Sequence, residues 1–143
     1  MAFFYYTDIE TEYLKKKDKR LGAVIDQLGH LKREVFDDLF EALVYSIVGQ
    51  QVSTKAQVTI WNRIRAHYGT VTPDAVRGLG ISGRKAGYIL DAAQKIRTGE
   101  LNLDALREKD DAAVERELCA LNGIGVWTAQ MLMTFCMQRK NIM

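Results

Sequence analysis

The sequence is short of several features that define whole classes of protein. It has 143 residues, with one proline, two cysteines and 9% aromatic residues. A single proline leaves no proline-rich linker, and Cys119 and Cys136 are too few for the four-cysteine spacing of an iron–sulfur cluster. We expect both cysteines to be buried free thiols. His30 and His67 have no ligand-type residues nearby, so no metal site and no cofactor is expected.

Long hydrophobic runs are also absent. No apolar stretch approaches the length of a bilayer span, and the N-terminus lacks the basic-then-apolar pattern of a signal segment. These absences predict a cytoplasmic protein with no membrane partner. A hydrophobic content of 48% with 27% charged residues is typical of a folded globular chain. At this length we expect one domain, spanning residues 1–143.

Acidic residues are scarce in two parts of the chain. Residues 42–90 contain one acid against six bases, and no acid follows Glu117, where Arg139 and Lys140 are the bases. Residues 100–117, by contrast, hold seven acids against three bases. The net charge of +2 decides little, but this distribution allows one positive face to meet phosphates. A mixed, solvated surface explains the same distribution equally well.

Helical periodicity dominates the sequence, and alternating strand patterns are scarce. Capping residues and glycines predict a series of helices. They run from Thr7 or Asp8 to Leu28 with a break near Asp18, from Asp37 or Asp38 onwards, from Ser53 to Gly69, from Ser82 to Gly99, from Asp110 or Asp111 to Gly123, and from Val126 to Gln138. The predicted fold class is therefore all-α.

The most specific signal lies in Leu121-Asn122-Gly123-Ile124-Gly125-Val126-Trp127-Thr128-Ala129. Glycine reaches positive φ and lets a turn lie close to another surface. The amides that open the next helix carry partial positive charge and suit a phosphate oxygen. This form is typical of a helix-hairpin-helix, which grips nucleic-acid backbone without reading sequence. The alternative is a helix closed by glycine and followed by another helix, as in any bundle.

Two further polar segments lie at predicted helix junctions. They are Gly49-Gln50-Gln51-Val52-Ser53 and Gly80-Ile81-Ser82-Gly83-Arg84-Lys85. Gln50 and Gln51 follow a very apolar helix and are candidates to probe base edges or a gap in a duplex. The alternative is that the two glutamines only cap the helix before them.

Together these segments resemble the helix-hairpin-helix DNA glycosylase superfamily, and within it the 3-methyladenine DNA glycosylase II branch. The segments Leu43-Val44-Tyr45-Ser46-Ile47-Val48-Gly49-Gln50-Gln51-Val52-Ser53, Gly80-Ile81-Ser82-Gly83-Arg84-Lys85-Ala86 and the hairpin occur in the family's order and roughly its spacing. The resemblance implies an all-helical domain that bends duplex DNA and turns a damaged base out into a cleft. The implied function is base-excision repair of alkylated purines such as 3-methyladenine.

The resemblance also assigns roles to individual residues. The hairpin amides would hold the phosphates beside the lesion, and Gln51 matches the wedge that fills the vacated stack. The implied DNA-binding residues are Leu121, Gly123, Ile124, Gly125, Val126, Trp127, Thr128, Lys85 and Ser53, and the implied wedge and base pocket comprise Gln50, Gln51, Val52 and Trp127.

Trp127 occupies the position at which bifunctional relatives such as endonuclease III carry a Schiff-base lysine. Tryptophan cannot act as an amine nucleophile, but it offers a π surface on which a positively charged alkylated purine stacks. The resemblance therefore points to a monofunctional N-glycosyl hydrolase without a lyase lysine. The alternative places Trp127 in the core behind the hairpin.

The family's catalytic aspartate, which stabilises an oxocarbenium-like sugar, follows the position of Trp127 by about twenty residues. Met143 follows Trp127 by only sixteen residues, so the aspartate would lie just after Met143. Glu115 and Glu117 precede the hairpin and are no stand-in for it. We expect residues 1–143 to be inactive in excision, with the C-terminal helices of the family fold missing. The apolar core left uncovered is expected to favour self-association or a partner.

Several functional hypotheses follow. The first is the N-terminal portion of an alkylbase glycosylase whose partner is double-stranded DNA, preferably damaged. The second is a non-catalytic helix-hairpin-helix DNA-binding module, and the third is one half of a split glycosylase. A helical interaction protein with no nucleic-acid role is the remaining alternative. The connection between Val76 and Ile81 is also shorter than in relatives, which touches none of the implied catalytic roles.

Overall fold

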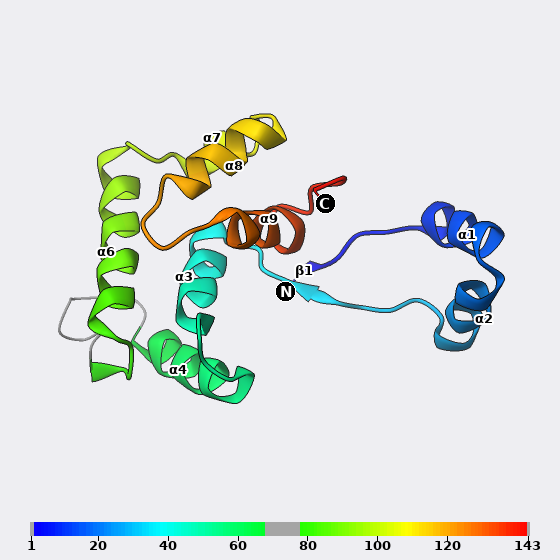
Figure 1. The fold of residues 1–143 in the computed structure, drawn as a ribbon, viewed down its shortest axis with the longest axis horizontal. Helices are drawn as coiled ribbons and strands as arrows, with labels where there is room; N and C mark the ends of the chain where they lie inside the picture. The colour runs from blue at the N-terminus through cyan, green and yellow to red at the C-terminus, as the bar shows by residue number, and fades with distance from the viewer. Residues whose placement is uncertain (1, 68–77, 143) are drawn as a thin grey trace. The chain divides into compact units, whose positions relative to one another are not determined.

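The computed structural model describes residues 2–67 and 78–142, and helices dominate it (Figure 1). The all-α prediction is therefore confirmed. The chain forms two compact units, Met1–Asp37 and Asp38–Met143. The single domain over residues 1–143 stays a prediction. None of the described helices is both long enough and apolar enough to cross a lipid bilayer.

The first unit contains two helices and a two-stranded antiparallel sheet: β1 (Ala2–Phe3), α1 (Asp8–Lys17), α2 (Lys19–Leu28) and β2 (Glu34–Val35). A capping box formed by Thr7 and Glu10 starts α1. Asp18 ends α1 and caps α2, since its carboxylate accepts hydrogen bonds from two amides of the next turn. Gly29, with φ 67°, ends α2. The predicted start, break and stop are confirmed.

The second unit contains α3 (Leu39–Gly49), α4 (Thr54–Ala66), α6 (Gly83–Thr98), α7 (Leu103–Leu106), α8 (Asp111–Cys119) and α9 (Val126–Phe135). The predicted N-caps Asp38, Ser53, Ser82 and Asp110 each accept a hydrogen bond from an amide of the helix that follows. Gly69, predicted to end the helix that begins after Ser53, and Val76, at one end of the short connection, lie outside the described residues.

Two helix ends differ from the prediction, and one short helix was not predicted. α8 ends at Cys119 instead of Gly123, because the chain leaves the helix in a turn before the glycine. α9 ends at Phe135 instead of Gln138, which has a φ of 53° and so cannot continue a right-handed helix. The four-residue helix α7, capped by Asn102, was not predicted, because it is too short to show a period in the sequence.

The core of the second unit is built around α3. This helix contacts α4, α6 and α9, and Figure 1 shows the three arranged around it. Its Leu43 and Ile47 are each only 1% exposed. Cys136 is buried as expected, whereas Cys119 is half-buried because it lies at the end of α8; both are free thiols. The central position of α3 brings its C-terminal end against elements that come much later in the chain.

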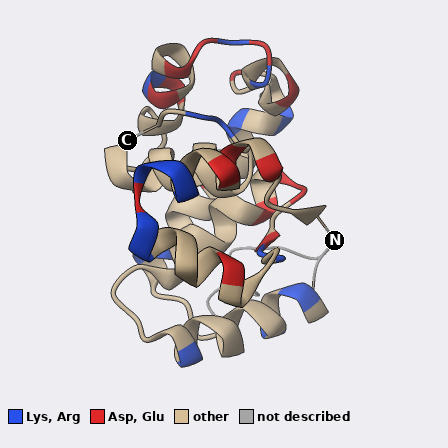
Figure 2. Ribbon diagram, turned by 90° about the vertical axis from the view of Figure 1, so that its right-hand side faces the viewer, with Lys and Arg blue, Asp and Glu red and all other residues tan. Residues whose placement is uncertain are grey.

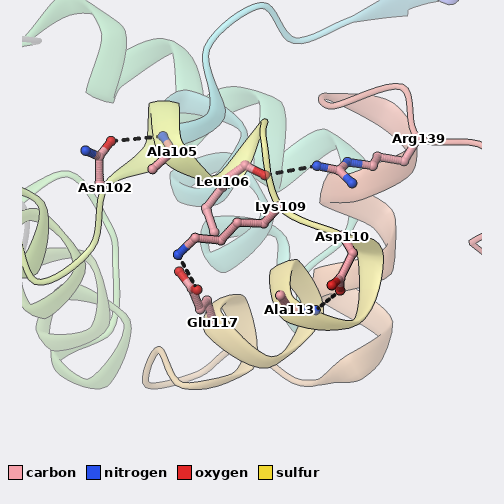
Figure 3. Close-up of polar contacts among 8 residues, drawn as sticks. All are labelled: Asn102, Ala105, Leu106, Lys109, Asp110, Ala113, Glu117 and Arg139. Atoms are coloured by element: carbon pink, nitrogen blue, oxygen red, sulfur yellow. Dashed lines mark hydrogen bonds and ion pairs between the residues drawn. The ribbon is translucent and has the colours of Figure 1, made fainter.

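Arg139 contacts both α7 and α8, and Figure 3 shows its bond to Leu106 at the end of α7. Its guanidinium donates to the Asp111 carboxylate at 2.8 Å and to the carbonyl oxygens of Leu106 and Arg107 at 2.9 and 3.1 Å. Because the guanidinium is charged, these are charge-assisted hydrogen bonds, which are stronger than those between neutral groups. Arg139, one of the two bases after Glu117, therefore serves the fold.

Exposed large apolar side chains are concentrated in the first unit. Ile9 and Tyr13 of α1 and Val24 and Leu28 of α2 are between 47% and 80% exposed. Those described in the second unit are Val52, Val58, Val126 and Trp127. Within the described residues, none of them lies toward the C-terminal end of α9. The uncovered C-terminal core, and self-association through it, stay predictions.

Candidate nucleic-acid interface

The turn between α8 and α9, residues 120–125, is the hairpin turn, and two buried apolar residues anchor it. Leu121 and Ile124 are 4% and 5% exposed, and the Ile124 amide donates to the Leu121 carbonyl at 3.2 Å. Between them Gly123 has φ 81°, in the left-handed region that glycine adopts without strain. A Cβ at Gly123 would lie 2.3 Å from an atom of the Tyr88 ring. Both the backbone conformation and the space therefore require glycine.

The N-terminus of α9 carries no side-chain cap. Its N-cap residue, Gly125, makes no capping hydrogen bond, whereas every other described helix begins after a Thr, Asp, Ser or Asn side chain that accepts one. The first amides of a helix have no acceptor within it. The amides of Val126, Trp127 and Thr128 are thus available to an anion, and the helix dipole favours one there.

Trp127 stands out at this uncapped end because its side chain faces solvent. The residue is 72% exposed, and its neighbour Val126 is 53% exposed. The alternative that Trp127 packs in the core behind the hairpin is therefore wrong. The buried tryptophan of the second unit is Trp61, which lies edge-on to Tyr45.

Residues 50–52 connect α3 to α4, and we call this segment the wedge turn after the role that the resemblance implies for it. Gln51 is exposed and has φ 55°, a left-handed conformation that costs a non-glycine residue about 1–2 kcal/mol. Val52 beside it is 37% exposed. The next residue, Ser53, accepts a hydrogen bond from the Ala56 amide and so caps α4. This turn places an amide and an apolar side chain in solvent on a strained backbone.

Gln50 and Gln51 are adjacent in sequence but differ in their surroundings. Gln50 is half-buried, and its Nε2 donates to the Gly123 carbonyl oxygen at 2.7 Å. This bond joins the wedge turn to the hairpin turn across 73 residues of sequence. Gln50 also occupies the C-cap position of α3. The alternative that it only caps this helix explains its backbone position, but not the hydrogen bond of its side chain to Gly123.

Lys85 lies in the first turn of α6, and its ammonium group reaches the C-terminal end of α3. Its Nζ donates to the Val48 carbonyl at 2.9 Å and also to the Gln50 carbonyl. Burial lowers the pKa of Lys85, because the protein removes water from the charged form. The sequence indicated Lys85 by its charge and its segment. Its two backbone partners, 37 and 35 residues earlier, could not be read from any local pattern.

The bases of α4 and the acids before the hairpin have different surroundings in the second unit. α4 carries Lys55, Arg63 and Arg65 and no acidic residue, and Figure 2 shows blue segments without red along this helix. The acids before the hairpin are held in contacts of the fold. Glu115 accepts a hydrogen bond from a glutamine of α9 at 3.0 Å, and Glu117 pairs with a lysine at 2.5 Å.

This fold is found in proteins of known structure. The crystal structure of a DNA-3-methyladenine glycosidase from Bacillus halodurans aligns with a TM-score of 0.77 and 30% identity, covering 100% of this chain and 70% of that chain. The chain belongs to the helix-hairpin-helix DNA glycosylase superfamily. The resemblance that the sequence motifs indicated is confirmed.

Two further matches define how far the similarity to glycosylases extends. A 3-methyladenine DNA glycosylase of Schizosaccharomyces pombe in complex with abasic DNA aligns with a TM-score of 0.79 and 22% identity, over 93% of this chain and 72% of that chain. A DNA-3-methyladenine glycosylase of Bacillus subtilis is 24% identical over 121 residues, which are 71% of this chain and 40% of the relative. The chain spans less than two thirds of the length of the curated relatives it matches. No family model matches the sequence.

In this chain the three indicated segments meet in space. Hydrogen bonds from Lys85 to the Gln50 carbonyl and from the Gln50 side chain to Gly123 join the start of α6, the wedge turn and the hairpin turn. Tyr88, which sequence reasoning missed, lies against Gly123. A tyrosine three residues after Lys85 on a helix is the signal that could have found it.

Proposed function

We propose that residues 1–143 form the DNA-binding part of a base-excision glycosylase that acts on alkylated purines such as 3-methyladenine. The observation that carries the proposal is the uncapped N-terminus of α9, with the exposed Trp127 in its first turn. The names of the relatives support the same function, and the Schizosaccharomyces pombe neighbour was solved with abasic DNA.

The hairpin binds the DNA backbone. Amides of Val126, Trp127 and Thr128 bind phosphate oxygens next to the lesion, in the manner of other helix N-termini. A Cβ added at Gly125 would meet no other atom within 4 Å, so the space around this part of the backbone is open to an approaching phosphate. Such contacts position the protein but carry no sequence information, so binding depends on shape and damage and not on base order.

Trp127 and the wedge turn act on the bases. An alkylated purine carries positive charge, and it stacks on the exposed indole ring after leaving the duplex. Gln51 fills the gap that the base leaves, and its amide hydrogen-bonds the unpaired partner base. Position 127 holds no amine, so the reaction is hydrolysis of the N-glycosidic bond without strand cleavage by a Schiff base.

A binding assay with two duplexes tests this function. We expect residues 1–143 to prefer a duplex with an abasic-site analogue over the intact duplex of the same sequence. Two to three phosphates neutralised by basic side chains, such as Lys55, Arg63 and Arg65 of α4, predict an affinity loss of about 10- to 40-fold between 50 and 200 mM salt. Affinity that is flat across this salt range would contradict the proposal, and binding without any preference for the abasic duplex would favour a module that only holds DNA.

Base release is a separate prediction. We expect residues 1–143 by themselves to release no base from methylated duplex DNA under single-turnover conditions. Glu115 and Glu117 are engaged in the fold, and the catalytic aspartate that the resemblance implies is not matched within residues 1–143. The measurement compares released 3-methyladenine with that from a protein matched in arginine and lysine content. Release above this control would show that a carboxylate within residues 1–143 supports the reaction.

A further inference from the structure

One face of α6 contacts both of the turns that the proposed function places on DNA. Lys85, Tyr88 and Asp91 are spaced three residues apart and therefore lie on the same face of the helix. Lys85 bonds the end of α3 beside the wedge turn. Tyr88 lies against the glycine of the hairpin turn, and Asp91 accepts a hydrogen bond from Asn122 of the same turn at 3.1 Å. α6 is thus a common support for two loops that are far apart in sequence.

These contacts form a closed series that begins and ends on α6, which we call the circuit. The Lys85 ammonium donates to the Gln50 carbonyl, the Gln50 side chain donates to the Gly123 carbonyl at 2.7 Å, and Gly123 lies against Tyr88, which returns to α6. Each contact joins two different segments. A shift of either turn relative to the other must therefore break at least one contact of the circuit.

We propose that Lys85 is a positioning residue that sets the wedge turn relative to the hairpin turn, and not a phosphate contact. The inference rests on the proposed function, because it names the support for the wedge. The carbonyls of Val48 and Gln50 lie at the end of α3, immediately before Gln51, where a helix leaves its last carbonyls without partners. An ammonium group on both carbonyls fixes the direction in which the chain leaves the helix, and with it the direction of Gln51.

The surroundings of Lys85 favour this role over a contact with DNA. Its Nζ donates to two carbonyl oxygens at the end of α3, and the residue is half-buried. This burial also lowers the pKa of Lys85. A cation at the C-terminus of a helix is also stabilised by the helix dipole. The left-handed backbone of Gln51 is strained, so it persists only while its neighbours hold it.

The test uses three variants and a fluorescent base. Lys85→Met removes the ammonium and keeps the length of the side chain, Lys85→Arg restores donors, and Arg97→Met removes one positive charge from the last turn of the same helix. 2-Aminopurine placed opposite an abasic-site analogue reports unstacking of the unpaired base. Hydrogen exchange of the amides in residues 48–53 and 121–125 reports the order of both turns without DNA.

We expect Lys85→Met to lower the preference for abasic over intact duplex by about tenfold, since it removes charge-assisted hydrogen bonds. The 2-aminopurine signal at saturation should fall, exchange should be faster in both turns, and the salt dependence of binding should not change. Lys85→Arg should recover part of the signal, and Arg97→Met should retain all of it.

Two results would overturn the inference. One is unchanged exchange and unchanged 2-aminopurine signal in Lys85→Met. The other is a slope of log affinity against log salt concentration that is smaller by about one, together with an unchanged 2-aminopurine signal at saturation. That combination is the mark of a phosphate contact. If the unaltered chain fails to bind DNA, the proposed function fails, and the exchange of the two turns in Lys85→Met still decides whether Lys85 positions them.

Discussion

Replacing Gly123 by alanine is expected to lower the free energy of unfolding of the second unit by about 2–4 kcal/mol. The residue has φ 81°, which strains any side chain other than hydrogen. The new Cβ would also lie 2.3 Å from the Tyr88 ring, which is held between α6 and the hairpin turn. Chemical denaturation followed by circular dichroism measures the loss, and the same variant should lose DNA binding with the geometry of the hairpin.

Gly125→Ala is the matched control, because it makes the same substitution two residues later. Gly125 has φ −96°, which any residue adopts, and a Cβ there meets nothing within 4 Å. We expect a cost of about 1 kcal/mol for alanine at this N-cap, because glycine is the better N-cap residue. The added methyl group should nevertheless weaken DNA binding, since it occupies the approach to the α9 amides. Equal destabilisation by the two substitutions would refute the specific role of Gly123.

Trp127→Ala is expected to weaken binding to damaged duplex by about 5- to 150-fold, the range for loss of one base–aromatic stack of about 1–3 kcal/mol. The melting temperature should not change, because the side chain is exposed and contributes little to the core. Fluorescence anisotropy with labelled methylated duplex measures the affinity. Affinity equal to that of the unaltered chain would show that no base stacks on this ring.

The second tryptophan supplies the control for Trp127. Trp61 is 7% exposed and lies edge-on to Tyr45, so Trp61→Phe should reduce stability and leave DNA affinity unchanged. The sequence contains two tryptophans, so this variant leaves Trp127 as the one fluorophore of its kind. Its emission should then change on addition of DNA. If Trp61→Phe binds DNA and the emission of Trp127 does not change, a base does not stack on this ring.

Local features of this protein could be predicted well from the sequence. The starts at Ser53 and Ser82 and the break near Asp18 were predicted correctly, and Thr7 and Asp38 were each one of two adjacent candidates. These starts are legible because a capping side chain bonds amides two or three residues away. The hairpin turn was recognisable for the same reason: the positive φ of Gly123 is a property of one residue. The ends of α8 and α9 were less accurate, because turns and C-terminal caps depend on weaker local preferences.

The sequence by itself therefore determined the longer helices, the hairpin and the glycosylase family, all of which depend on interactions or motifs within a few residues. Only the tertiary structure decided that Trp127 is exposed, that Gln50 and Gln51 differ in role, and that the ammonium of Lys85 belongs to α3. The bonds responsible join residues 35 to 73 positions apart. Such contacts arise from the packing of α6 and the hairpin turn around α3, and no local propensity encodes which polar groups that packing brings together.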